Sequence, residues 1–165
     1  LRRPELANDT AKSIDAIIDV ISKLNENYTH VVLLQPTSPL RNPDDIINML
    51  ELMKEHDAEA SVSVVPLEEP HPYKLKKIDA NGFIKPFLEG TSSELPRQSL
   101  PKAYALNGAI YITKIETILE KRTFLPDNTL PYMMDTNINI DSEEDFIFLE
   151  AMLGKKKVSI WGLDD

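Results

Sequence analysis

Apolar and polar positions follow helical and strand periods in turn along the first 66 residues. Between Asp9 and Leu24 apolar residues recur every three or four positions, which predicts an amphipathic helix. The continuous apolar run His30–Leu34 is typical of a strand buried on both faces of a parallel sheet. Asn42-Pro43 then begins a helix with an oxygen-bearing cap and a proline at its first position, and Ala60–Pro66 is a second strand. This order predicts an α/β fold, an open and mostly parallel sheet with helices on both faces.

The middle of the chain departs from this pattern. Residues 67–105 are rich in proline and charge, and Asp79–Gly82 reads as a turn between Lys74–Ile78 and Phe83–Phe87. A tight turn between two short apolar segments predicts a β-hairpin. We therefore divide the chain into an α/β core, residues 1–66 and 106–165, and a small β-rich insertion, residues 67–105.

Regular structure is predicted again after the insertion. The expected elements are a strand at Asn107–Ile112, a helix at Ile115–Lys121, a strand at Asn137–Ile140, a helix at Ser142–Leu153 and an edge strand at Val158–Trp161. In the fourth of these segments we expect Phe146, Leu149 and Leu153 to face inward.

Composition narrows the possible functions. The 165 residues carry 18 Lys and Arg against 27 Asp and Glu, a net charge of −9, which argues against a nucleic-acid partner. No cysteine is present, so disulfides, thiolate zinc sites and cysteine nucleophiles are excluded. No apolar run is long enough to cross a membrane and the start does not resemble a signal peptide, so we expect a cytoplasmic protein without a membrane partner. Because the chain starts at Leu1 rather than at a methionine, we expect it to be part of something longer.

The loop Gln35–Arg41, with the sequence QPTSPLR, is the first candidate for a binding site. It leaves the carboxyl end of a predicted buried strand, where open α/β sheets bind their ligands. It offers an amide, two hydroxyls and a guanidinium, and two prolines limit the entropy lost on ordering. A stiff connection without any ligand would explain the same composition.

The loop and a second segment, Asn107-Gly108-Ala109-Ile110-Tyr111, resemble motifs of the acylneuraminate cytidylyltransferases, the CMP-sialic acid synthetases. Weaker matches occur in the same order as in the family at Arg3–Ala7, Asp9–Ala11, His71–Lys74, Pro96–Gln98 and Ile140–Glu143. The resemblance implies a fold like that of nucleotide-diphospho-sugar transferases and transfer of CMP from CTP to a nine-carbon 2-keto-3-deoxy sugar acid. Activation of a related acid, such as legionaminate or deoxy-octulosonate, and a non-catalytic sugar-acid-binding module are the alternatives.

The resemblance also implies roles for individual residues. Nucleotide binding falls to Arg3, Ala7 and Asn8, and sugar binding to Gln35, Thr37, Ser38, Lys74, Arg97, Asn107, Tyr111 and Phe124. In this family the insertion forms a homodimer and reaches over the partner's site. Without the resemblance, Arg3, Lys74 and Arg97 would each be read as ordinary surface charges.

A site for Mg²⁺ or Mn²⁺ is implied at Asn139 and Asp141, which the resemblance makes the catalytic segment. Alternate residues of the strand predicted there share a face, so both oxygens could reach one ion. The family has aspartate at both positions, whereas this chain has an amide at Asn139. A second carboxylate could come from Asp135, Glu143 or Glu144, and Asp141 could instead cap the following helix.

Two further departures from the family affect the expected activity. Ala105 stands where members often have arginine, and nothing matches the glycine- and lysine-rich loop that binds the triphosphate at the start of the family's sequence. We therefore expect residues 1–165 alone to show no CMP transfer, and the strand His30–Leu34 to have an unpaired edge that favours aggregation.

Overall fold

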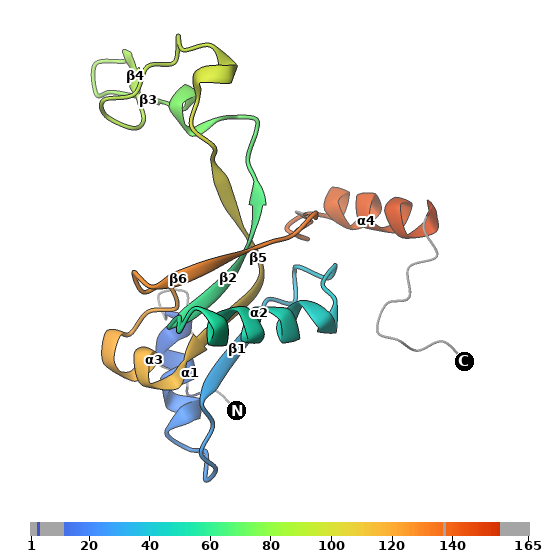
Figure 1. Cartoon of the computed structure of the whole chain (residues 1–165). Coiled ribbons are helices and arrows are strands. Elements are labelled where there is room, and N and C mark those ends of the chain that lie inside the picture. The colour runs from blue at the N-terminus through green and yellow to red at the C-terminus, as the bar shows by residue number, and fades with distance from the viewer. Residues whose placement is uncertain (1–2, 4–11, 137, 156–165) are drawn as a thin grey trace.

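The computed structural model describes residues 3, 12–136 and 138–155, and its centre is a four-stranded sheet (Figure 1). The strands are β1 (His30–Leu34), β2 (Ala60–Pro66), β5 (Tyr104–Lys114) and β6 (Thr129–Met133), in the spatial order β1-β5-β2-β6. Strand β5 is antiparallel to both β1 and β2, and β6 is parallel to β2. Three of the four strands therefore run in one direction, and β1 lies at an edge, as the sequence predicts.

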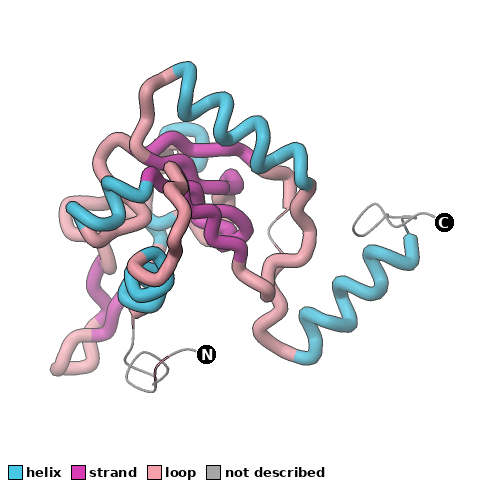
Figure 2. Tube along the Cα trace, turned by 90° about the horizontal axis from the view of Figure 1, so that it is seen from below, coloured by secondary structure: helices cyan, strands magenta, loops and turns pink. Residues whose placement is uncertain are grey.

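Helices lie on both faces of this sheet, which confirms the predicted fold class (Figure 2). The helices are α1 (Ser13–Ile21), α2 (Pro43–Glu55), α3 (Ile115–Lys121) and α4 (Glu143–Lys155). Helix α2 begins where predicted: Asn42 Oδ1 accepts from the Asp44 amide at 3.0 Å, and the Asn42 amide donates to Asp45 Oδ2 at 2.7 Å. This reciprocal cap satisfies amides that the first turn leaves unpaired.

The core lies between α2 and the sheet. Met49 and Met53 of α2 are packed against Ile110 and Ile112 of β5 and against Val65 of β2, all of them buried. Because Ile110 and Ile112 project toward α2, the intervening Tyr111 projects to the other face. No helix within the described residues is long and apolar enough to cross a membrane.

The chain leaves the sheet between β2 and β5, and residues 67–103 are called the arm here. The arm contains two 3-10 turns, η2 (Pro72–Lys74) and η3 (Arg97–Ser99), and an antiparallel hairpin of β3 (Lys76–Ile78) and β4 (Ile84–Pro86). The predicted hairpin is thus confirmed, with shorter strands. The Leu67 amide donates to the Ala103 carbonyl at 2.9 Å and joins the two ends of the arm, which extends away from the sheet (Figure 1).

Two expectations near the C-terminus differ from the structure. Residues 138–140 form no strand, and the Ile140 amide instead donates to the Thr37 carbonyl at 2.8 Å. The strand that pairs with the free side of β2 is β6, which lies earlier in the chain. The sequence pattern does not predict β6, because Pro131 interrupts it; an edge strand tolerates a proline. Leu149 is buried as predicted, but Phe146 is 50% exposed because α4 projects from the sheet (Figure 1). The strand predicted at Val158–Trp161 lies outside the described residues.

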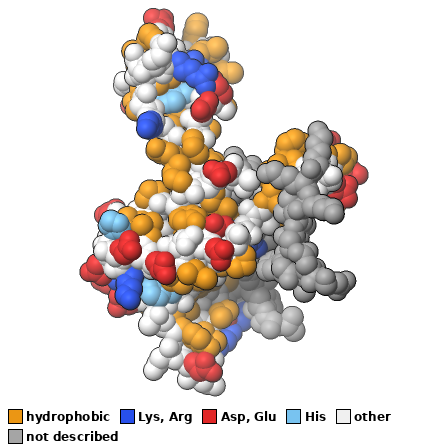
Figure 3. Space-filling view, turned by 45° about the vertical axis from the view of Figure 1, so that its right-hand side comes forward, with side chains coloured by type: hydrophobic (Ala, Val, Ile, Leu, Met, Phe, Trp, Pro, Cys, Tyr) orange, Lys and Arg blue, Asp and Glu red, His pale blue; other side chains and the backbone are white. Residues whose placement is uncertain are grey.

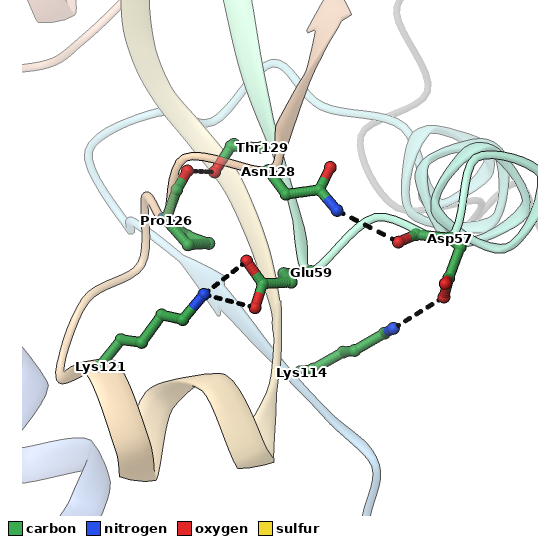
Figure 4. Close-up of polar contacts among 7 residues, drawn as sticks. All are labelled: Asp57, Glu59, Lys114, Lys121, Pro126, Asn128 and Thr129. Carbon is green, nitrogen blue, oxygen red and sulfur yellow. Dashed lines mark hydrogen bonds and ion pairs between the residues drawn. The ribbon is translucent and has the colours of Figure 1, made fainter.

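Ion pairs hold the amino end of β2 (Figure 4). Lys121 of α3 contacts both carboxylate oxygens of Glu59, at 2.6 and 2.9 Å, and the hydrogen bond to Glu59 raises the pKa of Lys121. Lys114 pairs with Asp57 at 3.2 Å, and Asn128 donates to the Asp57 carbonyl. These contacts fix α3 and the turn before β6, so the opposite, carboxyl end of β1 and β2 remains for a ligand site.

The register between β2 and β5 shifts at Ser63, because four residues of β5, Asn107–Ile110, lie opposite this one residue. The Ser63 hydroxyl accepts from the Ile110 amide at 2.9 Å and lies 2.6 Å from Asn107 Oδ1, to which it donates. Ser61, two residues earlier on the same face, is fully buried, and its hydroxyl has no hydrogen-bond partner among the described residues.

These two serines give a matched test of the bulge. We expect Ser63→Ala to lower the free energy of unfolding by roughly 1–3 kcal/mol, because it removes the hydroxyl that accepts from the buried Ile110 amide and one of the two hydrogen bonds to Asn107 Oδ1. Ser61→Ala removes a hydroxyl that has no partner among the described residues, so it is expected to be neutral or stabilising. Urea denaturation measures both; equal losses of stability would show that the hydroxyl of Ser63 does not hold the bulge.

Candidate active site

Three segments meet at the carboxyl end of β1: the loop Gln35–Arg41, the bulge of β5 and residues 138–141 before α4. Ser38, only 2% exposed, hydrogen bonds through its hydroxyl to Asn139 Oδ1 and lies 3.3 Å from the Asn107 carbonyl. The Thr136 hydroxyl donates to the Leu40 carbonyl at 3.3 Å. The structure therefore brings together Ser38 and Asn107, for which the resemblance implies sugar binding, and Asn139, for which it implies metal binding.

Asn107 is the buried centre of this junction. Its Oδ1 accepts from the Ser63 hydroxyl and from the Ala109 amide at 3.2 Å, and its Nδ2 donates to the Thr136 carbonyl at 3.2 Å and to Met134 Sδ at 3.3 Å. These contacts use both ends of the amide within the protein. The side chain of Asn107 consequently positions the surrounding segments, and direct sugar contact by it stays a prediction.

Gly108 allows the side chain of Gln35 to lie against the bulge. Its φ is +74°, and a Cβ at this position would lie 2.7 Å from Gln35 Oε1 and 3.3 Å from Ser38 Oγ. A contact of 2.7 Å is far inside van der Waals distance, so only glycine permits this approach. The backbone of Gly108 thus leaves room for the carboxamide of Gln35 at the start of the loop.

Arg41 is used by the loop itself. Its Nη1 donates to the carbonyl of Gln35 at 2.8 Å and to the carbonyl of Ser38 at 2.5 Å, and burial lowers the pKa of the guanidinium. The sequence offered this guanidinium as a ligand group, whereas the structure shows it closing the loop around its own backbone. The fixed loop leaves Gln35 and Thr37 as the side chains available to a ligand.

Tyr111 and Phe124 lie together on the face opposite α2. Their ring centroids are 6.3 Å apart at an interplanar angle of 60°, and burial raises the pKa of Tyr111. Tyr111 is directly opposite Leu33 of β1, so the two share a face, and Gln35 continues that alternation past the end of β1. These aromatic rings therefore form an apolar surface on the same side of the sheet as Gln35.

The predicted cations lie elsewhere in this chain. Lys74 and Arg97 are in the arm, both exposed, and neither forms a hydrogen bond or ion pair with Gln35, Ser38 or Tyr111. Arg97 pairs with Glu68 at 2.8 Å. Arg3 pairs with Asp19 of α1 at 2.7 Å, while Ala7 and Asn8 lie outside the described residues.

The structure separates Asn139 from Asp141. Without a strand at residues 138–140, the argument that alternation places both oxygens on one face is wrong, and the Asn139 oxygen accepts from Ser38. The helix cap is Ser142, whose hydroxyl accepts from the Asp145 amide, and the hydrogen bond from that hydroxyl is the main cause that lowers the pKa of Asp145. Asp141 is exposed and its carboxylate accepts no hydrogen bond from the described residues.

Gly90 provides a control for the contact between Gly108 and Gln35. Gly90 has a similar φ of +76° and nothing within 4 Å of the position of its Cβ. Gly90→Ala is expected to cost about 1 kcal/mol from backbone strain alone, and Gly108→Ala more, because the methyl group meets Gln35. The additional loss of unfolding free energy caused by Gly108→Ala should become smaller when Gly108→Ala is combined with Gln35→Ala. Urea denaturation measures this loss. An excess unchanged by that combination would place the clash with another residue.

Known proteins resemble this chain both in sequence and in fold. No sequence-family model matches the chain. The chain is 33% identical over 164 residues to the CMP-N,N'-diacetyllegionaminic acid synthase of Legionella pneumophila, covering 93% of this chain and 67% of that protein. It is 34% identical over 149 residues to the N-acylneuraminate cytidylyltransferase of Streptococcus agalactiae serotype V, covering 89% of this chain and 35% of the relative. The chain thus spans about a third of the length of the latter.

Solved structures share the fold at low sequence identity. The CMP:2-keto-3-deoxy-manno-octonic acid synthetase complexed with CTP superposes with a TM-score of 0.59 at 14% identity, over 89% of this chain and 70% of that chain. The 4-diphosphocytidyl-2C-methyl-D-erythritol synthase of Anaerococcus prevotii gives 0.57 at 12% identity, over 88% and 68%. Sequence identity over nearly the whole chain, together with this fold, shows that the chain belongs to the acylneuraminate cytidylyltransferase (CMP-sialic acid synthetase) family.

Proposed function

We propose that this protein transfers CMP from CTP to the anomeric hydroxyl of a nine-carbon 2-keto-3-deoxy sugar acid and releases pyrophosphate. The observation that supports this most is the junction of loop Gln35–Arg41, the bulge at Asn107-Gly108 and Asp141 at the carboxyl end of β1. The named activities of the two relatives, on an acylneuraminate and on a diacetyllegionaminate, support this substrate class. The same proposal places the protein in the cytoplasm, where CTP is available.

In this mechanism the protein acts mainly by orienting its substrates. The anomeric oxygen of the sugar attacks the α-phosphorus of CTP, and the bond to pyrophosphate breaks. Gln35, whose carboxamide lies beside Gly108, hydrogen bonds to the sugar acid in this proposal, while Tyr111 and Phe124 contact its apolar surface. Correct placement of the two reacting groups removes much of the entropic barrier.

The cations of the arm bind the sugar carboxylate in this proposal. Residues 67–105 carry six Lys and Arg against five Asp and Glu, a net +1, which leaves −10 on the rest of the chain. A substrate with a carboxylate is repelled by the core, so local cations such as Lys74 and Arg97 are needed to hold it. The ion pair of Arg97 with Glu68 is exposed, and such pairs contribute little free energy, so a substrate carboxylate can compete with it.

We further propose that the arm forms a homodimer. Its hairpin exposes Ile78, Phe83, Ile84 and Phe87, with exposed fractions of 57–74%, and hydrophobic side chains are visible on the surface of the arm (Figure 3). A two-stranded hairpin is too small to bury its own core, and a second copy of the chain can cover these side chains about a two-fold axis. The mildly basic arm would then lie against an acidic core. Light scattering that shows only a monomer at micromolar concentration would contradict this arrangement.

The described residues fit a magnesium ion held mainly by the nucleotide. They contain no group of three or more His, Cys, Asp or Glu side chains that could hold a metal. Mg²⁺ commonly takes one or two carboxylates, waters and substrate phosphates, which requires only the free carboxylate of Asp141. We therefore assign Asp141 as the protein ligand of Mg²⁺ or Mn²⁺, and give Asn139 the positioning contact with Ser38. When bound, the ion would neutralise charge on the triphosphate.

Gln35→Ala tests the assignment of the sugar site. In the complete protein, we expect kcat/KM for the sugar acid to fall roughly ten- to a few-hundredfold, because one positioning group is lost. The affinity for CTP should stay the same. Steady-state assays of pyrophosphate release, with each substrate varied in turn, measure both. Unchanged kinetics would make the loop a structural connection, and a wild-type protein that transfers no CMP would support a non-catalytic binding module.

Asp141→Asn tests the metal assignment. We expect the affinity for Mn²⁺ in the presence of CTP to fall by roughly tenfold or more, since the only protein carboxylate proposed at the ion is removed. Electron paramagnetic resonance of free Mn²⁺ measures this directly. Glu150→Gln, which alters an exposed carboxylate on α4, the helix that follows Asp141, is the matched control and should change nothing. Equal binding by Asp141→Asn and the unaltered protein would place the ligand elsewhere.

A further inference from the structure

His71 is a buried histidine in an otherwise exposed arm. It is 6% exposed, whereas Lys74 and Arg97, the two cations assigned to the sugar carboxylate, are both exposed. These cations lie on different turns, Lys74 on η2 and Arg97 on η3, and the hairpin of the arm separates the turns in sequence. Their separation in space therefore depends on a contact between the two turns.

The imidazole of His71 makes that contact. Its Nδ1 accepts from the Tyr73 amide at 3.2 Å, so the ring proton lies on Nε2, which donates to the Pro101 carbonyl at 2.9 Å. The Tyr73 ring meets the imidazole edge-on at a centroid distance of 5.3 Å. Both ring nitrogens are thus used in fixed directions, one within η2 and one across to the returning half of the arm.

The hydrogen bonds of His71 connect it to the turn that carries Lys74 and to the segment that follows the turn of Arg97. On the first side, the Lys74 amide donates to the His71 carbonyl at 2.8 Å, and the ring caps the same turn. On the other side, Pro101 follows directly after Leu100, whose amide closes η3 on the Arg97 carbonyl at 3.2 Å. His71 and Arg97 also line one hollow of about 360 Å³ at the root of the arm.

We propose that His71 is a positioning residue that sets the separation of the Lys74 ammonium and the Arg97 guanidinium, and so the recognition of the substrate carboxylate. This inference rests on the proposed function of these two cations. The surface pair of Arg97 with Glu68 cannot supply the same restraint, because both side chains are more than half exposed. No other side chain within the described residues hydrogen bonds the η2 turn to the segment that follows η3.

The geometric half of the proposal is tested with spin labels. Because the chain contains no cysteine, Lys74→Cys with Arg97→Cys gives two unique labelling sites. Pulsed electron–electron distance measurements should give one narrow distribution, which His71→Ala broadens or shifts. His56→Ala, an exposed histidine with no side-chain hydrogen bond, is the matched control and should leave the distribution unchanged. A distribution unaffected by His71→Ala overturns the proposal.

The functional half uses kinetics of the complete protein. We expect His71→Ala to raise KM for the sugar acid roughly tenfold with little change in KM for CTP. His71→Asn keeps an acceptor for the Tyr73 amide and loses the bond to Pro101, so it provides a better-folded variant that should still raise KM. In the Lys74→Ala, Arg97→Ala background, His71→Ala should have no further effect on KM.

The outcomes separate this proposal from the proposed function. A sugar KM that does not change, or an effect that persists without the two cations, overturns the positioning role even where the distances change. Absence of CMP transfer by the unaltered protein, with distances that respond to His71→Ala, instead contradicts the proposed function and leaves His71 as a structural brace only.

Discussion

The buried amide of Asn107 is the constraint on which the rest of the site depends. An amide in the core is costly unless both of its ends are hydrogen bonded. Here Ser63 and the Ala109 amide satisfy the oxygen, and the Thr136 carbonyl satisfies the nitrogen. Those partners come from β2, from β5 and from the segment that follows β6. One side chain therefore fixes the relative position of three parts of the chain that are far apart in sequence.

The position of Gln35 follows from that arrangement. The bulge around Asn107 gives Gly108 a positive φ and brings its backbone against the Gln35 carboxamide. Arg41 closes the loop from the other side through the carbonyls of Gln35 and Ser38. The backbone at the start of the loop is thus fixed by the part-buried guanidinium of Arg41, and Gly108 leaves room beside it for the Gln35 carboxamide.

The same junction accommodates Asn139, which carries an amide where the family has aspartate. Its oxygen accepts from the buried hydroxyl of Ser38, and the neighbouring Ile140 amide bonds to Thr37. Residues 138–141 are therefore attached to the loop Gln35–Arg41 rather than to the sheet. Asp141, the next residue toward α4, carries the carboxylate without a partner among the described residues. Placement of the proposed metal ligand thus depends on the loop that also holds Gln35.

The local elements and the family could be predicted from the amino-acid sequence alone. Strong signals such as the Asn42-Pro43 cap and the apolar run His30–Leu34 depend on neighbours in the chain, so α2 and β1 lie where they were predicted. Which residues lie together in the site could be seen only in the tertiary structure. The exposure of Phe146 and the lack of a strand at residues 138–140 could not be predicted, because both depend on contacts with segments that are distant in the sequence. For the same reason, spacing in the sequence could not show that His71 joins the two turns of the arm, or that Gly108 faces Gln35.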